Sequence, residues 1–252
     1  MEHAGKHALV TGGGSGIGKG IAIALAEAGA DVTITGRRAN KLDEVAAISP
    51  RLHALVMDVD DETSVRAGIA SAAKARGPVQ ICVANAGIAE GKPFADTTMA
   101  DWRRMMTTNL DGVFLTVQAA LATLAPDDPG RMIVISSIAG VRGLKNAVPY
   151  TVSKHAIIGL VRGLSEEYLK RPITFNALCP GYVDTDIVRN QLPGLMKRFE
   201  VDEQGAIDAM AKGNRSRKLL DVDETTAALM WLCSDGARSI NAQTVEISGG
   251  QV

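Results

Sequence analysis

Two hydrophobic patterns alternate along this chain. Short apolar runs rich in β-branched residues predict strands; they occupy residues 7–11, 31–35, 53–58, 79–84, 131–136, 173–178 and 244–247. Longer windows with apolar residues every three or four positions predict helices; they occupy residues 16–28, 40–48, 62–76, 99–125, 150–170 and 224–233. In the first window, Ile17, Ile21, Leu25 and Ala28 form one apolar stripe, as expected of a helix with one buried face.

Strands that alternate with helices are typical of βαβ units and of a parallel sheet with helices on both faces. Strands in such a sheet are buried on both sides, which fits uninterrupted apolar runs such as residues 132–135. The sequence therefore predicts an α/β fold with a seven-stranded, doubly wound sheet and one domain over residues 1–252. Residues 186–220 are long and charged for a connection, and we expect a helical lid there.

Composition excludes several classes of protein. The 252 residues carry a net charge of −1 and 4% aromatic residues, which argues against nucleic-acid binding. No apolar run approaches the roughly 20 residues of a membrane span, and no signal peptide precedes the first strand. Cys82, Cys179 and Cys233 are an odd number in apolar surroundings, and are expected to be reduced core thiols of a cytoplasmic protein. No His or Cys spacing indicates a metal site.

A glycine-rich segment joins the first strand to the first helix. Residues 11–18 read Thr-Gly-Gly-Gly-Ser-Gly-Ile-Gly. Glycines let the backbone turn tightly and approach a pyrophosphate, which the N–H groups at the helix N-terminus then bind. The alternative, a plain tight turn, explains the glycines less well because a strand precedes them and an amphipathic helix follows. The residues expected to hold the dinucleotide here are Gly12, Gly14, Ser15, Gly16, Ile17 and Gly18.

Further motifs follow in a fixed order. They are Asn85-Ala86-Gly87 after the fourth strand, Asn109 in the next helix, Ser136-Ser137 at the end of the fifth strand, Tyr150 and Lys154 in the fifth helical window, and Pro180-Gly181 with Thr185 after the sixth strand. Together with the Thr-Gly-x-x-x-Gly-x-Gly spacing, these motifs resemble the short-chain dehydrogenase/reductase family over essentially the whole chain. The resemblance is strongest to members that act on 3-oxoacyl thioesters. It implies a Rossmann-type domain and reversible hydride transfer between a nicotinamide cofactor and a ketone or secondary alcohol.

Tyr150 and Lys154 are four residues apart and therefore share one face of a helix. A tyrosine pKa near 10 is too high for a base at pH 7, and a nearby ammonium together with a positive nicotinamide is expected to lower it. By itself Tyr-x-x-x-Lys is commonly an exposed surface pair. The resemblance implies that Tyr150 donates or accepts the proton, Ser137 orients the substrate oxygen, Lys154 lowers the tyrosine pKa and binds the ribose, and Asn109 supports a proton-relaying water. An alignment slip between Ser136 and Ser137 stays open.

The resemblance also assigns other residues to the cofactor. Asp58 and Val59 are expected beside the adenine. The remaining positions, from the turns after the fourth and sixth strands, are Asn85, Ala86, Gly87, Pro180, Gly181, Val183 and Thr185, with Tyr150 and Lys154 shared with catalysis. The family further implies a homotetramer, in which the helices of Asn109 and Tyr150 pack across one two-fold axis. The last strand and residues 248–252 would meet across another.

The residues after the second strand bear on the choice of cofactor. NAD enzymes place an acidic residue there to bind the ribose hydroxyls. Here the strand ends Thr-Gly-Arg-Arg, and Asp31 and Asp43 lie too far on either side. Arg37 can bind a 2′-phosphate, while Arg38 helps or is merely solvated. Many NADP-using relatives carry a basic residue at the position of Ser15, and its absence here favours NAD. NADP is the preferred prediction and NAD the alternative.

The substrate is less specified. A 3-oxoacyl thioester fits Arg171, at a position where such reductases use basic residues for an acyl carrier, and it fits a basic and apolar lid. The lid residues concerned are Lys197, Arg198, Lys212, Arg215, Arg217 and Lys218, with Leu195, Met196, Phe199 and Met210. An ordinary amphipathic lid with solvated charges explains them equally. A sugar, polyol or steroid substrate remains an alternative. A non-catalytic dinucleotide sensor is a further alternative, disfavoured because all four catalytic positions are intact.

Overall fold

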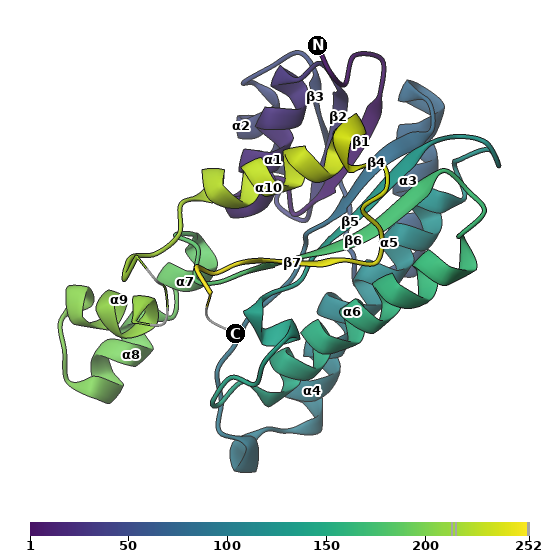
Figure 1. Ribbon diagram of the computed structural model, residues 1–252. Coiled ribbons are helices and arrows are strands. Elements are labelled where there is room, and N and C mark those ends of the chain that lie inside the picture. Colours follow the sequence, from purple (N-terminus) through teal and green to yellow (C-terminus); the bar gives the residue numbers. More distant parts are fainter. Residues whose placement is uncertain (213, 215, 251–252) are drawn as a thin grey trace.

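The computed structural model of this chain describes residues 1–212, 214 and 216–250 (Figure 1). Within these residues, seven strands form one parallel sheet in the order β3-β2-β1-β4-β5-β6-β7. The strands are β1 (His7–Thr11), β2 (Asp31–Gly36), β3 (Leu52–Val56), β4 (Val79–Ala84), β5 (Gly130–Ile135), β6 (Ile173–Pro180) and β7 (Thr244–Ile247). The predicted fold class is thereby confirmed.

Helices cover both faces of the sheet, and each face has its own apolar core. Helices α1 (Gly16–Glu27), α2 (Ala39–Ala46) and α10 (Val222–Cys233) pack on one face. Helices α3 (Glu62–Arg76), α5 (Gly112–Leu121) and α6 (Val148–Glu167) pack on the other. Because successive strand residues point to opposite faces, Ala8 and Val10 of β1 join the first core and Leu9 joins the second.

Strand β3 departs from the predicted pattern. It ends at Val56, and only Leu52 among its residues is buried, because it is an edge strand with one neighbour. The prediction that every strand is buried on both faces is therefore wrong for β3, and also for β7 at the other edge, where no residue is buried. Asp58 and Val59 lie in the connection after this strand instead of at its end.

The predicted helix over residues 99–125 is interrupted. The chain forms α4 (Met99–Met106), then a π-helical segment η2 (Thr107–Asp111), and only then α5, which ends at Leu121. A π-turn accommodates one extra residue and commonly occurs at functional positions. Here it contains Asn109, which is fully buried.

Asn109 ties the π-turn to its surroundings. Its Oδ1 accepts a hydrogen bond from the Ile88 N–H at 2.8 Å, and its Nδ2 donates to the Ile88 carbonyl at 2.9 Å. Nδ2 also lies 3.2 Å from the hydroxyl of Ser153 on α6. One side chain therefore holds together the π-turn, the connection after β4 and α6.

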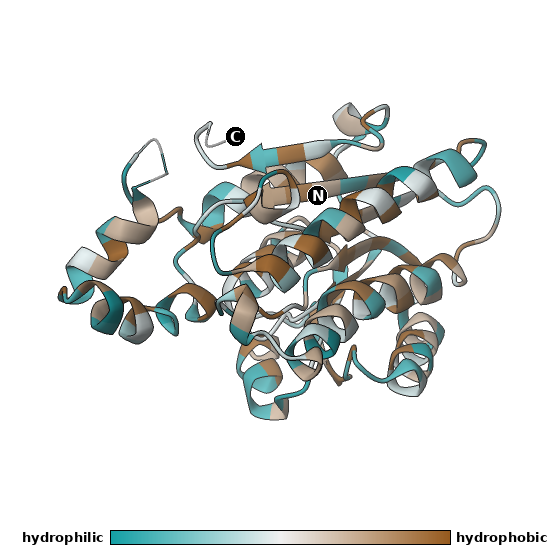
Figure 2. Ribbon diagram, turned by 90° about the horizontal axis from the view of Figure 1, so that it is seen from below, coloured by the Kyte–Doolittle hydropathy of each residue, from teal (hydrophilic) through white to brown (hydrophobic). Residues whose placement is uncertain are grey.

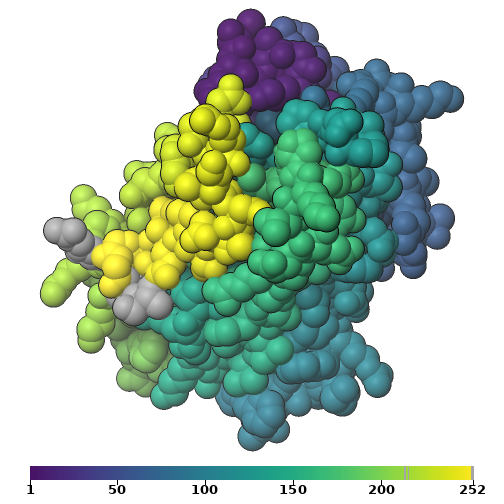
Figure 3. Space-filling model, turned by 45° about the vertical axis from the view of Figure 1, so that its right-hand side comes forward, coloured from purple at the N-terminus to yellow at the C-terminus, as the bar shows by residue number. Residues whose placement is uncertain are grey.

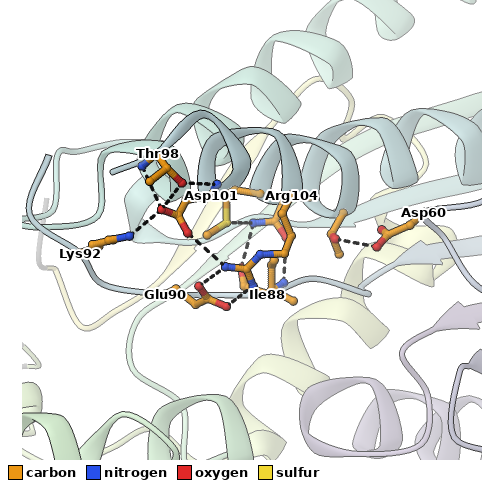
Figure 4. Close-up of polar contacts among 10 residues, drawn as sticks. Asp60, Ile88, Glu90, Lys92, Thr98, Asp101 and Arg104 are labelled. Carbon is orange, nitrogen blue, oxygen red and sulfur yellow. Dashed lines mark hydrogen bonds and ion pairs between the residues drawn. The ribbon is translucent and has the colours of Figure 1, made fainter. Parts of the chain in front are cut away.

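Ion pairs secure the rest of the connection between β4 and α4 (Figure 4). Arg104 binds Glu90 through both guanidinium Nη atoms, and Lys92 Nζ lies 2.7 Å from Asp101. Asp101 also forms a capping box with Thr98 at the start of α4. These contacts join residues 88–93 to α4, so that this connection has a defined position at the end of the sheet.

A helical insertion leaves the sheet after β6. It comprises α7 (Asp186–Arg189), α8 (Leu192–Phe199) and α9 (Glu203–Ala211), and Figures 1 and 2 show α8 and α9 standing out from one side of the molecule. Its two ends meet in a bridge between Val183 and Leu220. A small apolar cluster of its own, including Val188, Leu192 and Met210, stabilises it. Within the described part of the chain, no helix is long and apolar enough to span a membrane.

Replacing Asn109 with Asp tests the importance of the π-turn contacts. The change substitutes an acceptor for the Nδ2 donor and buries a charge against the Ile88 carbonyl. We expect the free energy of unfolding to fall by about 2–4 kcal/mol, measured by urea denaturation. Asp111→Asn, at an exposed position of the same segment, is the control and should change stability by less than about 0.5 kcal/mol. Equal stability of Asn109→Asp and wild type would contradict this assignment.

Candidate active site

Three predicted catalytic residues converge at the carboxyl end of β5. Ser137 follows the strand, while Tyr150 and Lys154 lie one turn apart on α6. The Ser137 and Tyr150 side chains are hydrogen-bonded to each other. Lys154 Nζ lies 5.7 Å from the centre of the Tyr150 ring and donates to the Ile135 carbonyl at 2.9 Å. Parallel sheets place ligands at this end of their strands.

The two adjacent serines have different surroundings. Ser136 Oγ donates to the Lys154 carbonyl at 3.1 Å, so its hydroxyl holds β5 against α6. Ser137 is instead hydrogen-bonded through its side chain to Tyr150. Gly140 packs against Ser136, and a Cβ added to Gly140 would lie 2.5 Å from Ser136 Oγ. The two hydroxyls therefore have different partners, and the choice of Ser137 over Ser136 stays a prediction.

Burial controls the ionisation of both residues on α6. It raises the pKa of Tyr150, and the hydrogen bond with Ser137 only partly opposes this effect. Burial also lowers the pKa of Lys154 to about 8. The sequence argument expected a lowered tyrosine pKa, but among the chain's own residues desolvation is the largest effect. Tyr150 is therefore protonated at neutral pH, as a proton donor must be.

Gly87 lies close to the side chains of both Asn109 and Lys154. A Cβ added to Gly87 would be 3.1 Å from Asn109 Oδ1 and 3.7 Å from Lys154 Nζ. A larger residue at this position would crowd both side chains. The structure thus brings all four residues of the predicted catalytic set to one region.

The glycine turn packs against the end of β4. Gly12 has a φ of +68°, and a Cβ there would lie 2.8 Å from Asn85 Nδ2. Asn85 Nδ2 donates to the Thr11 carbonyl at 2.8 Å, and the Asn85 and Ala86 N–H groups both donate to Thr11 Oγ1 at 3.0 Å. These polar groups of Asn85 and Ala86, predicted as cofactor contacts, hold β1 and β4 together.

The start of α1 suits a phosphate. Ser15 is its N-cap, and among the described residues its side chain caps none of the first N–H groups of the helix. Those groups and the positive end of the helix dipole are available to an anion. Gly16, with a φ of +52°, lies against Thr185 from the turn after β6, where a Cβ would approach to 3.1 Å. The turn therefore fits the pyrophosphate of a dinucleotide.

The end of β2 lies beside this turn. β2 ends at Gly36, followed by the exposed residues Arg37 and Arg38. Arg38 Nη2 donates to Ser15 Oγ at 3.4 Å, which places its guanidinium over the glycine turn. Asp31 lies at the opposite end of β2, near Arg51 and His53.

A cleft of about 1120 Å³ connects these parts. The predicted residues that line it are Ile17, Asn85, Gly87, Ser137, Tyr150, Lys154, Pro180, Gly181, Val183 and Thr185. The predicted residues that do not line it are Gly12, Gly14, Ser15, Gly16, Gly18, Arg37, Arg38, Asp58, Val59, Ala86 and Asn109.

The sequence reading missed the outer wall of the cleft. Tyr182 and Gln191 line it, as do residues 88–91 and 144–147. Of these, Tyr182 had a usable signal, because it directly follows Pro180-Gly181. Met210, Leu195, Arg198 and Phe199 are the predicted lid residues that reach the cleft. Arg215 is outside the described residues.

Arg171, the expected basic residue for an acyl carrier, lies just before the N-terminal end of β6, away from the cleft of the same chain. Its guanidinium donates to the Pro126 and Ala125 carbonyls. Its observed role is therefore to hold the connection after α5. Among residues 1–212, 214 and 216–250, no group of three His, Cys, Asp or Glu residues is placed to bind a metal ion.

Comparison with known proteins agrees with this geometry. The family model described as short chain dehydrogenase matches residues 6–195. A granaticin polyketide synthase putative ketoacyl reductase of Streptomyces violaceoruber is 34% identical, covering 96% of this chain and 92% of its own. Gluconate 5-dehydrogenase of Gluconobacter oxydans is 30% identical, covering 98% and 94%.

A solved structure is also similar over its full length. A variant of the actinorhodin polyketide ketoreductase, in a crystal structure with NADPH, superimposes with a TM-score of 0.92 and 28% identity, covering 98% of this chain and 97% of that one. With matching sequence, fold and length, this chain belongs to the short-chain dehydrogenase family and is an oxidoreductase that transfers a hydride between a nicotinamide cofactor and a ketone or secondary alcohol.

Proposed function

We propose that Tyr150 is the proton donor in reduction and the base in oxidation, and that Ser137 orients the substrate oxygen. The hydrogen bond between their side chains carries this proposal, because one oxygen atom placed beside both hydroxyls would accept from each. Lys154 binds the nicotinamide ribose and stabilises the tyrosinate. Asn109 supports a water that relays protons to Lys154. The dinucleotide lies along the glycine turn, with Asp58 and Val59 beside its adenine and Pro180, Gly181, Val183 and Thr185 beside its nicotinamide.

The chain's own residues then manage charge during reduction. The bound nicotinamide supplies the hydride. As the carbonyl carbon is reduced, negative charge grows on the substrate oxygen, and Tyr150 neutralises it by donating its proton. Ser137 holds that oxygen in place, and the Lys154 ammonium stabilises the phenolate that remains. With a pKa of about 8, Lys154 is mostly charged at neutral pH and can lose a proton at modest cost.

Tyr150→Phe tests the assignment of the proton donor. The change removes one oxygen atom, and kcat should fall by about 10²–10⁴. Cofactor affinity, measured by fluorescence titration, should change little. Lys154→Ala is the matched comparison, and should weaken both turnover and cofactor binding. Near-normal turnover by Tyr150→Phe would show that another group supplies the proton.

We propose NADP as the preferred cofactor. β2 ends without a carboxylate that would bind ribose hydroxyls or repel a 2′-phosphate, and Arg37 follows directly. Many NADP-using relatives carry a basic residue at the position of Ser15. Here the Arg38 guanidinium donates to Ser15 Oγ and supplies a positive charge at that place. The solved relative with NADPH supports the same choice.

The cofactor proposal predicts a selective effect of Arg37→Ala and Arg38→Ala. Each should lower kcat/KM for NADPH by about tenfold, since each removes a charge-assisted contact at an exposed site. The value for NADH should change by less than about threefold. Lys74→Ala on the exposed side of α3 controls for the loss of a surface charge. A wild type that prefers NADH would overturn the proposal.

For the substrate, we propose a 3-oxoacyl thioester or a related small ketone, with α7–α9 acting as a lid over the cleft. The relative named as a putative ketoacyl reductase supports the thioester. The similarity to gluconate 5-dehydrogenase supports a sugar acid as the alternative substrate. A screen of acyl thioesters, sugars and ketones, followed at the nicotinamide absorbance, separates these classes. A protein that binds cofactor but reduces none of them would be the sensor.

We propose a cytoplasmic homotetramer of single-domain chains. The three cysteines are free and buried, as expected in a reducing compartment. Phe114 on α5 and Val152 on α6 are 44% and 39% exposed, which suits packing of these helices against a second copy. The C-terminal part of the chain with α10 and β7, yellow in Figure 3, lies at the surface, and the second interface is expected at β7. Gln251 and Val252 are outside the described residues.

Light scattering tests the assembly. Wild type should have four times the chain mass of 26.4 kDa at micromolar concentration. Phe114→Glu should lower that mass, because it places a charge in the proposed helix interface. Phe94→Glu, at another exposed aromatic residue, should not. A monomeric wild type would refute the tetramer.

A further inference from the structure

The outer part of the cleft has an unbalanced positive charge. Apart from tyrosines, the ionisable side chains among the described residues that line the cleft are Glu90, Lys145, Lys154 and Arg198. Lys154 belongs to the reaction centre beside Tyr150. This leaves one acidic and two basic side chains on the surface where a substrate would extend.

Glu90 does not balance the two basic groups. Both of its carboxylate oxygens accept hydrogen bonds from Arg104, as Figure 4 shows, and Arg104 also lies 3.8 Å from Asp101. A carboxylate bound on both oxygens by a guanidinium is already compensated. The remaining charge on this wall is that of Lys145 and Arg198.

Lys145 and Arg198 reach the cleft from different segments. Lys145 belongs to residues 144–147, immediately before α6, and Arg198 to the last turn of α8. Among the ion pairs of the described residues, none includes either side chain, and the contact found for Arg198 is with the Phe199 ring. Two separate segments therefore present free cations to one volume.

Both side chains are exposed, and neighbouring contacts hold the segments that carry them. The Lys92 N–H donates to the Asn146 carbonyl at 2.6 Å, which ties residues 144–147 to the connection secured by Arg104 and Asp101. The Arg198 guanidinium lies 5.3 Å from the centre of the Phe199 ring, and Phe199 also lines the cleft. A guanidinium beside an aromatic ring can still use its N–H groups to bind an anion.

We infer that the substrate carries an anionic group, which Lys145 and Arg198 bind while the reacting carbonyl lies at Ser137 and Tyr150. This inference rests on the proposed function, and narrows its substrate class. The chemistry required is an oxyanion with two or more acceptors. Either the carboxylate of an oxo acid or a phosphate of an acyl thioester supplies one, and substrate pairs distinguish them.

The experiment compares each acid with a neutral molecule of nearly the same shape. Acetoacetate is paired with methyl acetoacetate, and 4-oxopentanoate with its methyl ester. The acetoacetyl thioester of 4′-phosphopantetheine is paired with that of pantetheine, which lacks only the phosphate. Rates of NADPH and NADH oxidation give kcat/KM for wild type, Lys145→Gln and Arg198→Gln. Lys197→Gln is the matched control, because it removes the same charge from the same turn of α8 at a residue that does not line the cleft.

Wild type should prefer the anionic member of at least one pair by about tenfold, and Lys145→Gln and Arg198→Gln should each remove most of that preference. Rates with the neutral members should change less than about twofold, and Lys197→Gln should behave as wild type. Added salt should reduce only the rates of the anionic members. Preference in the acid pairs alone identifies a carboxylate, and preference in the thioester pair alone identifies a phosphate.

Two contrary results are separable. If neutral ketones are reduced as well as the anions, or if both variants keep the preference, the anion site is wrong and the proposed reductase function stands. If wild type reduces no member of any pair and no ketone of the wider screen, the proposed function fails, and the anion site fails with it.

Discussion

The hydrogen bonds between Thr11 and the Asn85-Ala86 pair support the architecture of the whole site. They join the carboxyl ends of β1 and β4, the two strands between which the order of the sheet reverses. From this point α1 packs on one face of the sheet and α5 on the other, which leaves a crevice between the two departing chains. The glycine turn can occupy that crevice because Gly12 and Gly18 have no Cβ where Asn85 lies.

A second set of contacts sets the position of α6 relative to β5. Ile135 accepts from the Lys154 side chain, Ser136 donates to the Lys154 backbone, and Ser137 is bonded to Tyr150. Three consecutive residues at the end of β5 thus form hydrogen bonds to α6. The buried ammonium is costly to desolvate, and this cost appears as its lowered pKa. Because burying this ammonium lowers the stability of the fold, a role in the reaction explains the presence of Lys154 better than a stabilising role does.

The outer parts of the cleft follow a different principle. Residues 88–93, residues 144–147 and α8 come from separate connections, and ion pairs, backbone bonds and a small separate apolar cluster hold them. Such contacts tolerate substitution better than a buried core does, because most of them are exposed to solvent. The arrangement therefore combines a buried centre around Lys154 with an outer wall held by more exposed contacts.

Local pattern alone determined much of this protein. Hydrophobic periodicity predicted the strands and most helices, since it reports which face of each element is buried. The glycine turn after β1 indicated a nucleotide site, because it depends on short-range geometry. The pair Tyr150 and Lys154 became a candidate only through the order of several motifs along the chain, since its spacing alone is common on helix surfaces. Only the tertiary structure decided the rest. The π-turn at Asn109 depends on Ile88 and Ser153, which are distant in sequence, and the role of Asn85 depends on Thr11. The direction of the Tyr150 pKa shift is set by burial, and the charge of the outer cleft by the pairing of Glu90 with Arg104. Each of these properties results from contacts between segments that sequence periodicity does not bring together.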